Sequence, residues 1–79
     1  MDEFEEGKQK FLELVGTIDS SVAVVIPVTP SNGLFHISLT KGTNRKFINV
    51  LEDDILDLPQ EEMSVKSTTA MLQEAIGAL

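Results

Sequence analysis

The stretch from Val22 to Val50 constrains the fold more than any other part of the chain. It contains three segments rich in Val, Ile and Phe, separated by clusters of turn-forming residues at 29–33 and 41–44. β-Branched and aromatic residues favour a pleated, half-buried surface, whereas Gly, Asn, Ser and Pro favour turns. The pattern predicts a three-stranded antiparallel β-meander with strands near 21–28, 34–40 and 45–51.

The apolar residues of these strands are predicted to share one face of the sheet. A two-residue turn at Asn32-Gly33 sets Val28 opposite Ile37, whereas a four-residue loop sets Val28 opposite Phe35. Side chains alternate with a period of two, so both registers keep the same residues together. A turn at Gly42-Thr43 extends the set to the third strand. The predicted core face holds Val22, Val24, Ile26, Val28, Phe35, Ile37, Leu39, Ile48 and Val50.

The opposite face of the predicted sheet has a mixed composition. Such a face suits an antiparallel sheet that is covered by helices on one side only. Pro27 lacks an amide hydrogen, so the first strand is expected at a sheet edge. If Val25, Leu34 and Phe47 are exposed there, a partner surface or a second copy could cover them. The mixed face holds Ala23, Val25, Pro27, Leu34, His36, Ser38, Thr40, Arg45, Phe47 and Asn49.

A helix is predicted before the sheet, over roughly 2–15. Apolar residues recur there at spacings of seven, four and three, the period of an amphipathic helix. Gly16 is expected to be the C′ residue that ends this helix. Gly7 lies inside it, where glycine either weakens the helix or allows a close approach to the sheet.

Two further helical segments are predicted after the sheet. A short helix near 52–58 is expected to end before Pro59, with Leu51, Ile55 and Leu58 on one face. A last helix over about 64–77 is expected to begin with Ser64 as its cap. The fold class is therefore α+β, a meander packed on one face by N- and C-terminal helices in a single domain spanning 1–79.

Composition limits the classes of function that fit the chain. With 79 residues, 42% of them apolar, it has the size of one small globular domain, whose stability would gain from oligomerisation. The absence of cysteine fits a reducing cytoplasm, and the acidic start does not have the features of a signal peptide. No apolar run approaches the roughly 20 residues that span a bilayer. A formal charge of −7 disfavours phosphate backbones and anionic lipid unless the positive charges are concentrated.

Three of the six basic residues surround the predicted second hairpin turn, at Lys41, Arg45 and Lys46. Together with His36 and Phe47 they could form a surface for nucleic acid or a phosphate ligand, because a sheet with aromatics and cations can stack bases. The glycine-rich phosphate-loop pattern is missing, and the turn joins two strands rather than a strand and a helix.

The predicted element order, α-β-β-β-α, is similar to that of double-stranded-RNA-binding domains. Those domains begin their last helix with a lysine cluster, whereas the segment Val65-Lys66-Ser67-Thr68-Thr69 offers one lysine. The order and the acidity are also similar to those of small secretion-chaperone-like proteins. That second resemblance implies a sheet and helices presented to a partner polypeptide.

The acidic run Glu52, Asp53, Asp54 and Asp57 is the cluster most like a metal or catalytic site. Carboxylates can hold Ca²⁺ or Mg²⁺ or divide acid and base roles. The calcium-loop pattern with its central glycine is absent, and acidic residues also stabilise the start of a helix. His36 is the only histidine, and one histidine without cysteine gives no zinc ligand set.

The sequence thus contains no reaction signature and predicts a non-enzymatic, cytoplasmic protein-binding or regulatory module without a cofactor. The partner would be a protein or a second copy, bound at the mixed face or by strand addition at an edge. The alternatives are nucleic-acid or phosphate binding through the basic hairpin, and a metal or carboxylate site at Glu52–Asp57. The predicted partner-binding residues are Val25, Leu34, His36, Phe47, Lys41, Arg45 and Lys46.

Overall fold

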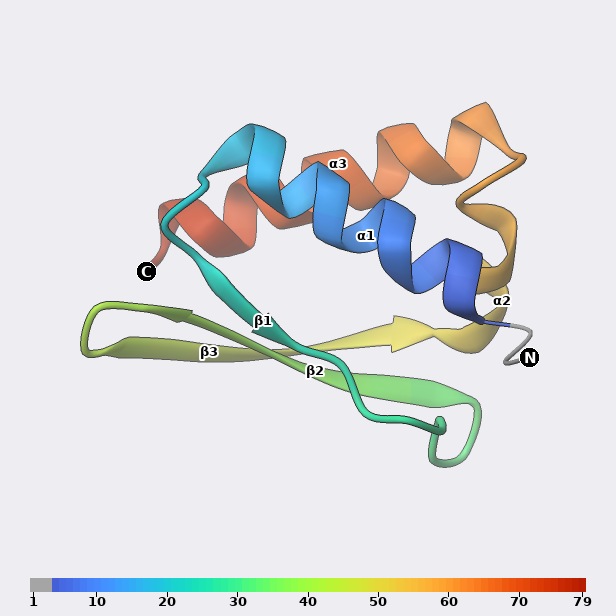
Figure 1. The fold of residues 1–79 in the computed structure, drawn as a ribbon, viewed down its shortest axis with the longest axis horizontal. Helices are drawn as coiled ribbons and strands as arrows, with labels where there is room; N and C mark the ends of the chain where they lie inside the picture. Colours follow the sequence, from blue (N-terminus) through green and yellow to red (C-terminus); the bar gives the residue numbers. More distant parts are fainter. Residues whose placement is uncertain (1–3) are drawn as a thin grey trace.

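The computed structural model describes residues 4–79. Its three strands form one antiparallel sheet in the order β1-β2-β3, and α1 and α3 lie across the same face of that sheet (Figure 1). The predicted α+β class and the three-stranded meander are confirmed. The elements are α1 (Glu5–Ile18), β1 (Ala23–Val25), β2 (Leu34–Lys41), β3 (Asn44–Leu51), α2 (Glu52–Asp57) and α3 (Glu62–Gly77).

The first hairpin combines features of both predicted registers. Asn32-Gly33 forms a tight turn in which both residues have positive φ, 53° and 77°, as a type I′ turn requires. β1 nevertheless pairs with β2 so that Val24 lies opposite Leu39, the register of the longer loop. The irregular segment 26–30 absorbs the two-residue difference. Because the shift is an even number, every strand residue keeps its face.

β1 is shorter than the predicted strand near 21–28. It ends at Val25, because Pro27 has a fixed φ and no amide hydrogen with which to continue the ladder. Val28, which was predicted on the core face, is 79% exposed. Its carbonyl oxygen accepts a hydrogen bond of 2.9 Å from Lys8 Nζ of α1. β1 does lie at an edge of the sheet, as Pro27 predicts.

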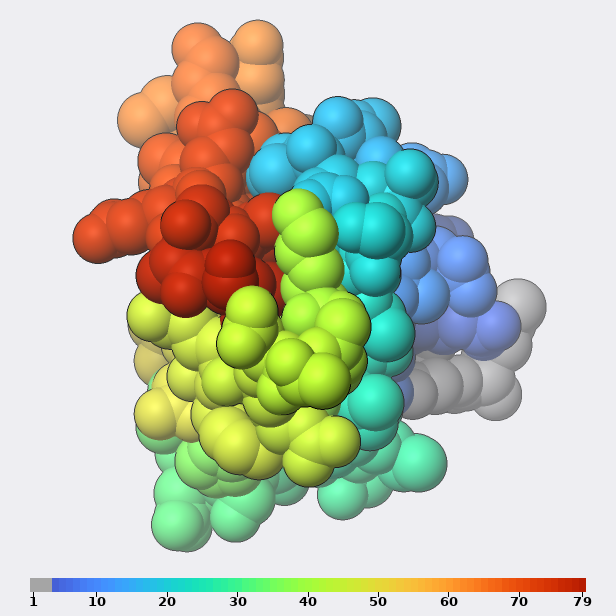
Figure 2. Space-filling model, turned by 90° about the vertical axis from the view of Figure 1, so that its left-hand side faces the viewer, coloured from blue at the N-terminus to red at the C-terminus, as the bar shows by residue number. Residues whose placement is uncertain are grey.

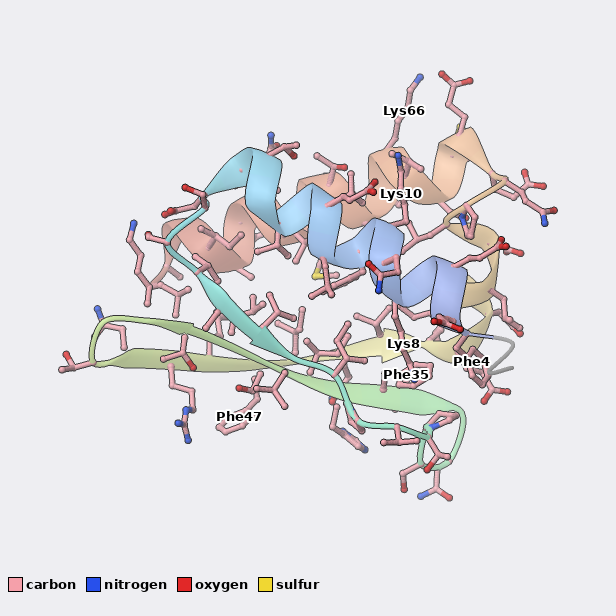
Figure 3. The ribbon with its side chains drawn as sticks, viewed as in Figure 1. Phe4, Lys8, Lys10, Phe35, Phe47 and Lys66 are labelled. Atoms are coloured by element: carbon pink, nitrogen blue, oxygen red, sulfur yellow. The ribbon has the colours of Figure 1, made fainter. Side chains whose placement is uncertain are left out.

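The core lies between the helices and the side of the sheet that they cover. Phe35 of β2 is fully buried there, and the ring of Phe4 meets it edge-on with 5.1 Å between the ring centroids. Both phenylalanines lie on the helix side of β2 (Figure 3). The buried core consists of Phe4, Phe11, Val15, Phe35, Ile37, Leu39, Val50, Ile55, Leu58, Leu72, Ala75 and Ile76.

Two predicted helix ends are wrong. α1 continues through Gly16 to Ile18, because Ile18 follows the buried stripe and packs against the core. The predicted start of this helix near residue 2 lies outside the described residues. α3 begins at Glu62, so Ser64 lies within its first turn instead of capping it.

Gly7 marks the point where α1 meets α2. A Cβ atom placed on Gly7 would lie 1.9 Å from the backbone oxygen of Ile55. The close approach that the sequence suggested is therefore real, but it is made to α2 rather than to the sheet. Among residues 4–79 no helix is long and apolar enough to cross a lipid bilayer.

Candidate functional site

The candidate site is the face of the sheet opposite α1 and α3. Both long helices lie on the other side, so none of the described elements covers this face (Figures 1 and 3). Strand register and alternation determine which side chains it carries. We call it the open face; it consists of Ala23, Val25, Leu34, His36, Ser38, Thr40, Arg45, Phe47, Asn49 and Leu51.

Three apolar side chains of the open face are strongly exposed. Val25 is 64%, Phe47 68% and Leu51 55% accessible to solvent. Val25 and Phe47 occupy one row across the sheet, because both pair with Ser38. Leu34 pairs with Leu51 two rows further along. Figure 3 shows Phe47 pointing away from the helices. Exposed apolar residues grouped on one surface are typical of interaction sites.

His36 and Asn49 form the row between these two apolar rows. Nδ1 of His36 lies 2.7 Å from Oδ1 of Asn49, and the two residues are directly opposite in the β2–β3 pair. A carboxamide oxygen can only accept, so the imidazole donates this hydrogen bond from Nδ1. The open face therefore places oriented polar groups beside its apolar ones, the combination that gives a binding surface specificity.

The structure separates the cations that the sequence groups around the second hairpin. Arg45 lies on the open face opposite Thr40, whereas Lys41 and Lys46 alternate to the helix side. Lys46 lines a hollow beside α3. The predicted partner-binding set is thus brought together only in part. The members that share the open face are Val25, Leu34, His36, Arg45 and Phe47.

The other described cations also lie away from the open face. Lys10 on α1 and Lys66 on α3 project from the helix side of the molecule (Figure 3). Lys8 donates to the carbonyl oxygen of Val28 and lies 5.4 Å from the centroid of the Phe35 ring. The cations of residues 4–79 are therefore distributed between the open face and the helix side of the molecule.

The acidic run occupies α2. Glu52, Asp53 and Asp54 form the first turn of this helix, and Asp57 ends it. Carboxylates at this position interact favourably with the positive end of the helix dipole. Among residues 4–79, no group of three or more His, Asp or Glu side chains is arranged to hold a metal ion. The structure therefore places three of these four carboxylates at the start of α2, where the helix dipole favours negative charge.

Leu51 belongs to the open face although the sequence pattern did not identify it there. The sequence suggested a helical face shared with Ile55 and Leu58, but Leu51 is the last residue of β3 and precedes α2. Ile55 and Leu58 are buried, as expected. The sequence feature that could have placed Leu51 on the open face is the alternation of Arg45, Phe47, Asn49 and Leu51, which continues to the end of the predicted strand.

The ion pair between Lys41 and Asp19 joins the second hairpin to the end of α1. Nζ of Lys41 lies 2.6 Å from Oδ2 of Asp19. Oδ1 of the same carboxylate accepts hydrogen bonds from the amide and the hydroxyl of Ser21, at 2.9 and 2.6 Å. The Lys41 hydrogen bond, followed by those from Ser21, holds the pKa of Asp19 well below its usual range.

We expect this ion pair to lose its stabilising effect as the solution becomes acidic. An unfolded aspartate has a pKa of about 3.9, and the folded value is lower, so the contribution is complete above about pH 5. The contribution of the ion pair to the free energy of unfolding falls as the pH drops through the pKa that Asp19 has in the folded protein. Lys41→Met should raise the pKa of Asp19 toward 3.9, which a carbon-13 NMR titration of the carboxyl group would measure. Lys46→Met is the matched control. An unchanged Asp19 titration in Lys41→Met would contradict the ion pair.

Comparison of the chain with protein-family models, curated proteins and solved structures gives no significant match.

Proposed function

We propose that the protein is a non-enzymatic binding module whose open face binds a protein partner. The observation that carries the proposal is the exposure of Val25, Phe47 and Leu51 on one uncovered sheet face, each more than half accessible. Aromatic and arginine residues dominate the energetics of protein interfaces, and Phe47 has Arg45 two residues away on the same face.

The partner we propose is an amphipathic helix that carries an acidic residue. The same sheet already packs α1 and α3 on its other face, so its width and twist suit helical packing (Figure 1). Arg45 is the formally charged side chain of the open face and stands at the hairpin end. A carboxylate on the partner helix would meet it, while apolar side chains at helical spacing would cover Phe47 and Val25.

A library of displayed helical peptides tests this proposal. The peptides would have a fixed alanine- and glutamate-rich scaffold, with randomised residues at i, i+3, i+4 and i+7. We expect selected peptides to contain large apolar residues and to bind the wild-type protein. Phe47→Asp should weaken this binding by about 30-fold or more, because buried aromatic anchors contribute 2 kcal/mol or more at interfaces. Titration calorimetry would measure the loss.

Met63→Asp is the matched control. The exposed fraction of Met63, 71%, is similar to the 68% of Phe47, but Met63 lies on α3 rather than on the open face. Peptide binding should survive this change. Far-UV circular dichroism should show both variants folded. Loss of the fold in Phe47→Asp would mean that a core face had been mistaken for a solvent face. Equal binding by Phe47→Asp and wild type would contradict the proposed site.

A further inference from the structure

Among residues 4–79, no strand pairs with the backbone amides and carbonyls on the outer edge of β3. The tight turn at Gly42-Thr43, with Gly42 at φ 62°, makes Lys41 and Asn44 a hydrogen-bonded pair. Hydrogen-bonded pairs then alternate along the hairpin, and the bond of 2.9 Å from the Glu52 amide to the Gly33 carbonyl shows that this alternation holds to its end. The groups that point away from β2 are therefore the amides and carbonyls of Arg45, Phe47 and Asn49 and the amide of Leu51. The Leu51 carbonyl is at the N-cap position of α2 and accepts the first hydrogen bond of that helix.

The two edges of the sheet differ in their capacity to accept another strand. β3 is eight residues long and contains no proline, and among residues 4–79 no strand pairs with its outer side. β1 has three residues, and the chain beyond it contains Pro27 and is held to α1 through the Lys8–Val28 hydrogen bond. Long regular edges without proline are the ones that pair with other chains. β3 is the edge open to strand addition.

The charges at the two ends of β3 indicate what would pair with it. Arg45 and Lys46 follow the first residue of the strand, Asn44, and Glu52 and Asp53 of α2 come directly after its last residue. When two copies of this segment lie antiparallel, the basic end of each meets the acidic end of the other. A two-fold axis produces this match twice. We propose that the occupant of the β3 edge is a second copy of this chain, paired antiparallel through β3.

In one register of such a pair, the side chains that lie opposite each other are compatible on both faces of the sheet. With Asn49 opposite Asn49 of the second copy, Phe47 lies opposite Leu51 of the second copy on the open face. On the helix side, Ile48 lies opposite Val50 of the second copy and Lys46 opposite Glu52 of the second copy. A shift of two residues in one direction would instead place Lys46 opposite Val50 and Arg45 opposite Leu51. A shift of two residues in the other direction would place Phe47 opposite Asp53 and Ile48 opposite Glu52. The aligned register thus pairs apolar residues with apolar ones and opposite charges with each other.

The helix side of the β3 edge has shallow space for the added strand. α3 lies over the β3 side of the sheet and α1 over the β1 side (Figure 2). Two neighbouring hollows of about 200 and 160 Å³ follow β3 beneath α3 and share Met71. Lys46, Ile48 and Glu74 line the larger one. Side chains of the incoming strand on the helix side would occupy this groove.

Sedimentation equilibrium over a range of protein concentrations tests the pairing. We expect a dimer, and we expect Lys46→Glu and Glu52→Lys each to weaken it by about tenfold or more, because each change replaces two attractive pairs with repulsive ones. The double variant Lys46→Glu/Glu52→Lys exchanges the charges and should restore the dimer. A protein that is monomeric at millimolar concentration would overturn the proposal. A dimer unaffected by the single changes would also overturn it.

Amide hydrogen exchange gives a second measurement that does not depend on substitution. The Phe47 and Asn49 amides point outward, so they should become protected as protein concentration rises. The Val24 amide at the other edge should not change. Exchange at Phe47 and Asn49 that is independent of concentration in a dimeric sample would contradict β3 pairing. This inference goes beyond helix binding at the open face, and one variant distinguishes the two proposals. Lys46 lies on the helix side of the sheet, so Lys46→Glu should disrupt the dimer and leave peptide binding at the open face intact.

Discussion

Replacing Gly7 with alanine is expected to destabilise the protein by about 1–3 kcal/mol. Intrinsic helix propensity acts in the opposite direction, since alanine is favoured over glycine inside a helix by up to about 1 kcal/mol. The contact with α2 decides the outcome. The new methyl group would lie 1.9 Å from the carbonyl oxygen of Ile55 and 2.7 Å from its carbonyl carbon. These are backbone atoms, so the clash cannot be relieved by a rotamer change, and α1 and α2 must move apart.

Gly16→Ala is the matched control on the same helix. Gly16 is exposed, and a Cβ atom there would have no neighbour within 4 Å. Only the higher helix propensity of alanine should act there, and it should raise the free energy of unfolding by up to about 1 kcal/mol. Thermal unfolding followed by circular dichroism would show the difference, because 1 kcal/mol shifts Tm by roughly 4–8 °C for a domain of this size. Equal stability of the two variants would contradict the close contact between α1 and α2.

The contrast between these two glycines shows what the sequence could predict and what it could not. Both lie within a helical pattern, and a close approach at Gly7 could be suspected because glycine is otherwise unfavourable inside a helix. Its partner could not be predicted, because the contact depends on how α2 folds back after the sheet, far along the chain. Gly16 looked like a helix end, yet burial of Ile18 against the core extends the helix past it. Tertiary packing overrode the local signal in both cases.

The sheet was more predictable, because alternation survives an uncertain register. The strand order and the two faces followed from the period of two and the two turns. The length of β1 did not, since Pro27 ends pairing early and Val28 turns outward to accept a hydrogen bond from α1. For the site, alternation placed Phe47 and Val25 correctly on the open face. Proximity in sequence was misleading for Lys41 and Lys46, which flank Arg45 along the hairpin but point to the other face.

The Phe35→Ala substitution is expected to cost about 3–5 kcal/mol, the usual cost of deleting a buried phenylalanine side chain. Phe35 is fully buried, its ring is in edge-on contact with Phe4 at 5.1 Å, and Lys8 Nζ lies 5.4 Å from its centroid. Truncation would leave a cavity between α1 and the sheet. A chain of 79 residues has a total stability of about 4–12 kcal/mol, so this loss is a large part of the whole.

Phe47→Ala removes the same side chain from the other face of the same sheet. Phe47 is 68% exposed, so the expected loss is below about 1 kcal/mol and reflects mainly strand propensity. Urea unfolding at low micromolar concentration, where self-association is least, would compare the two variants. A large loss for Phe35→Ala with a small one for Phe47→Ala is the result that an open face requires. Comparable losses would show that both faces are covered in solution, and the reverse order would show that the faces had been exchanged.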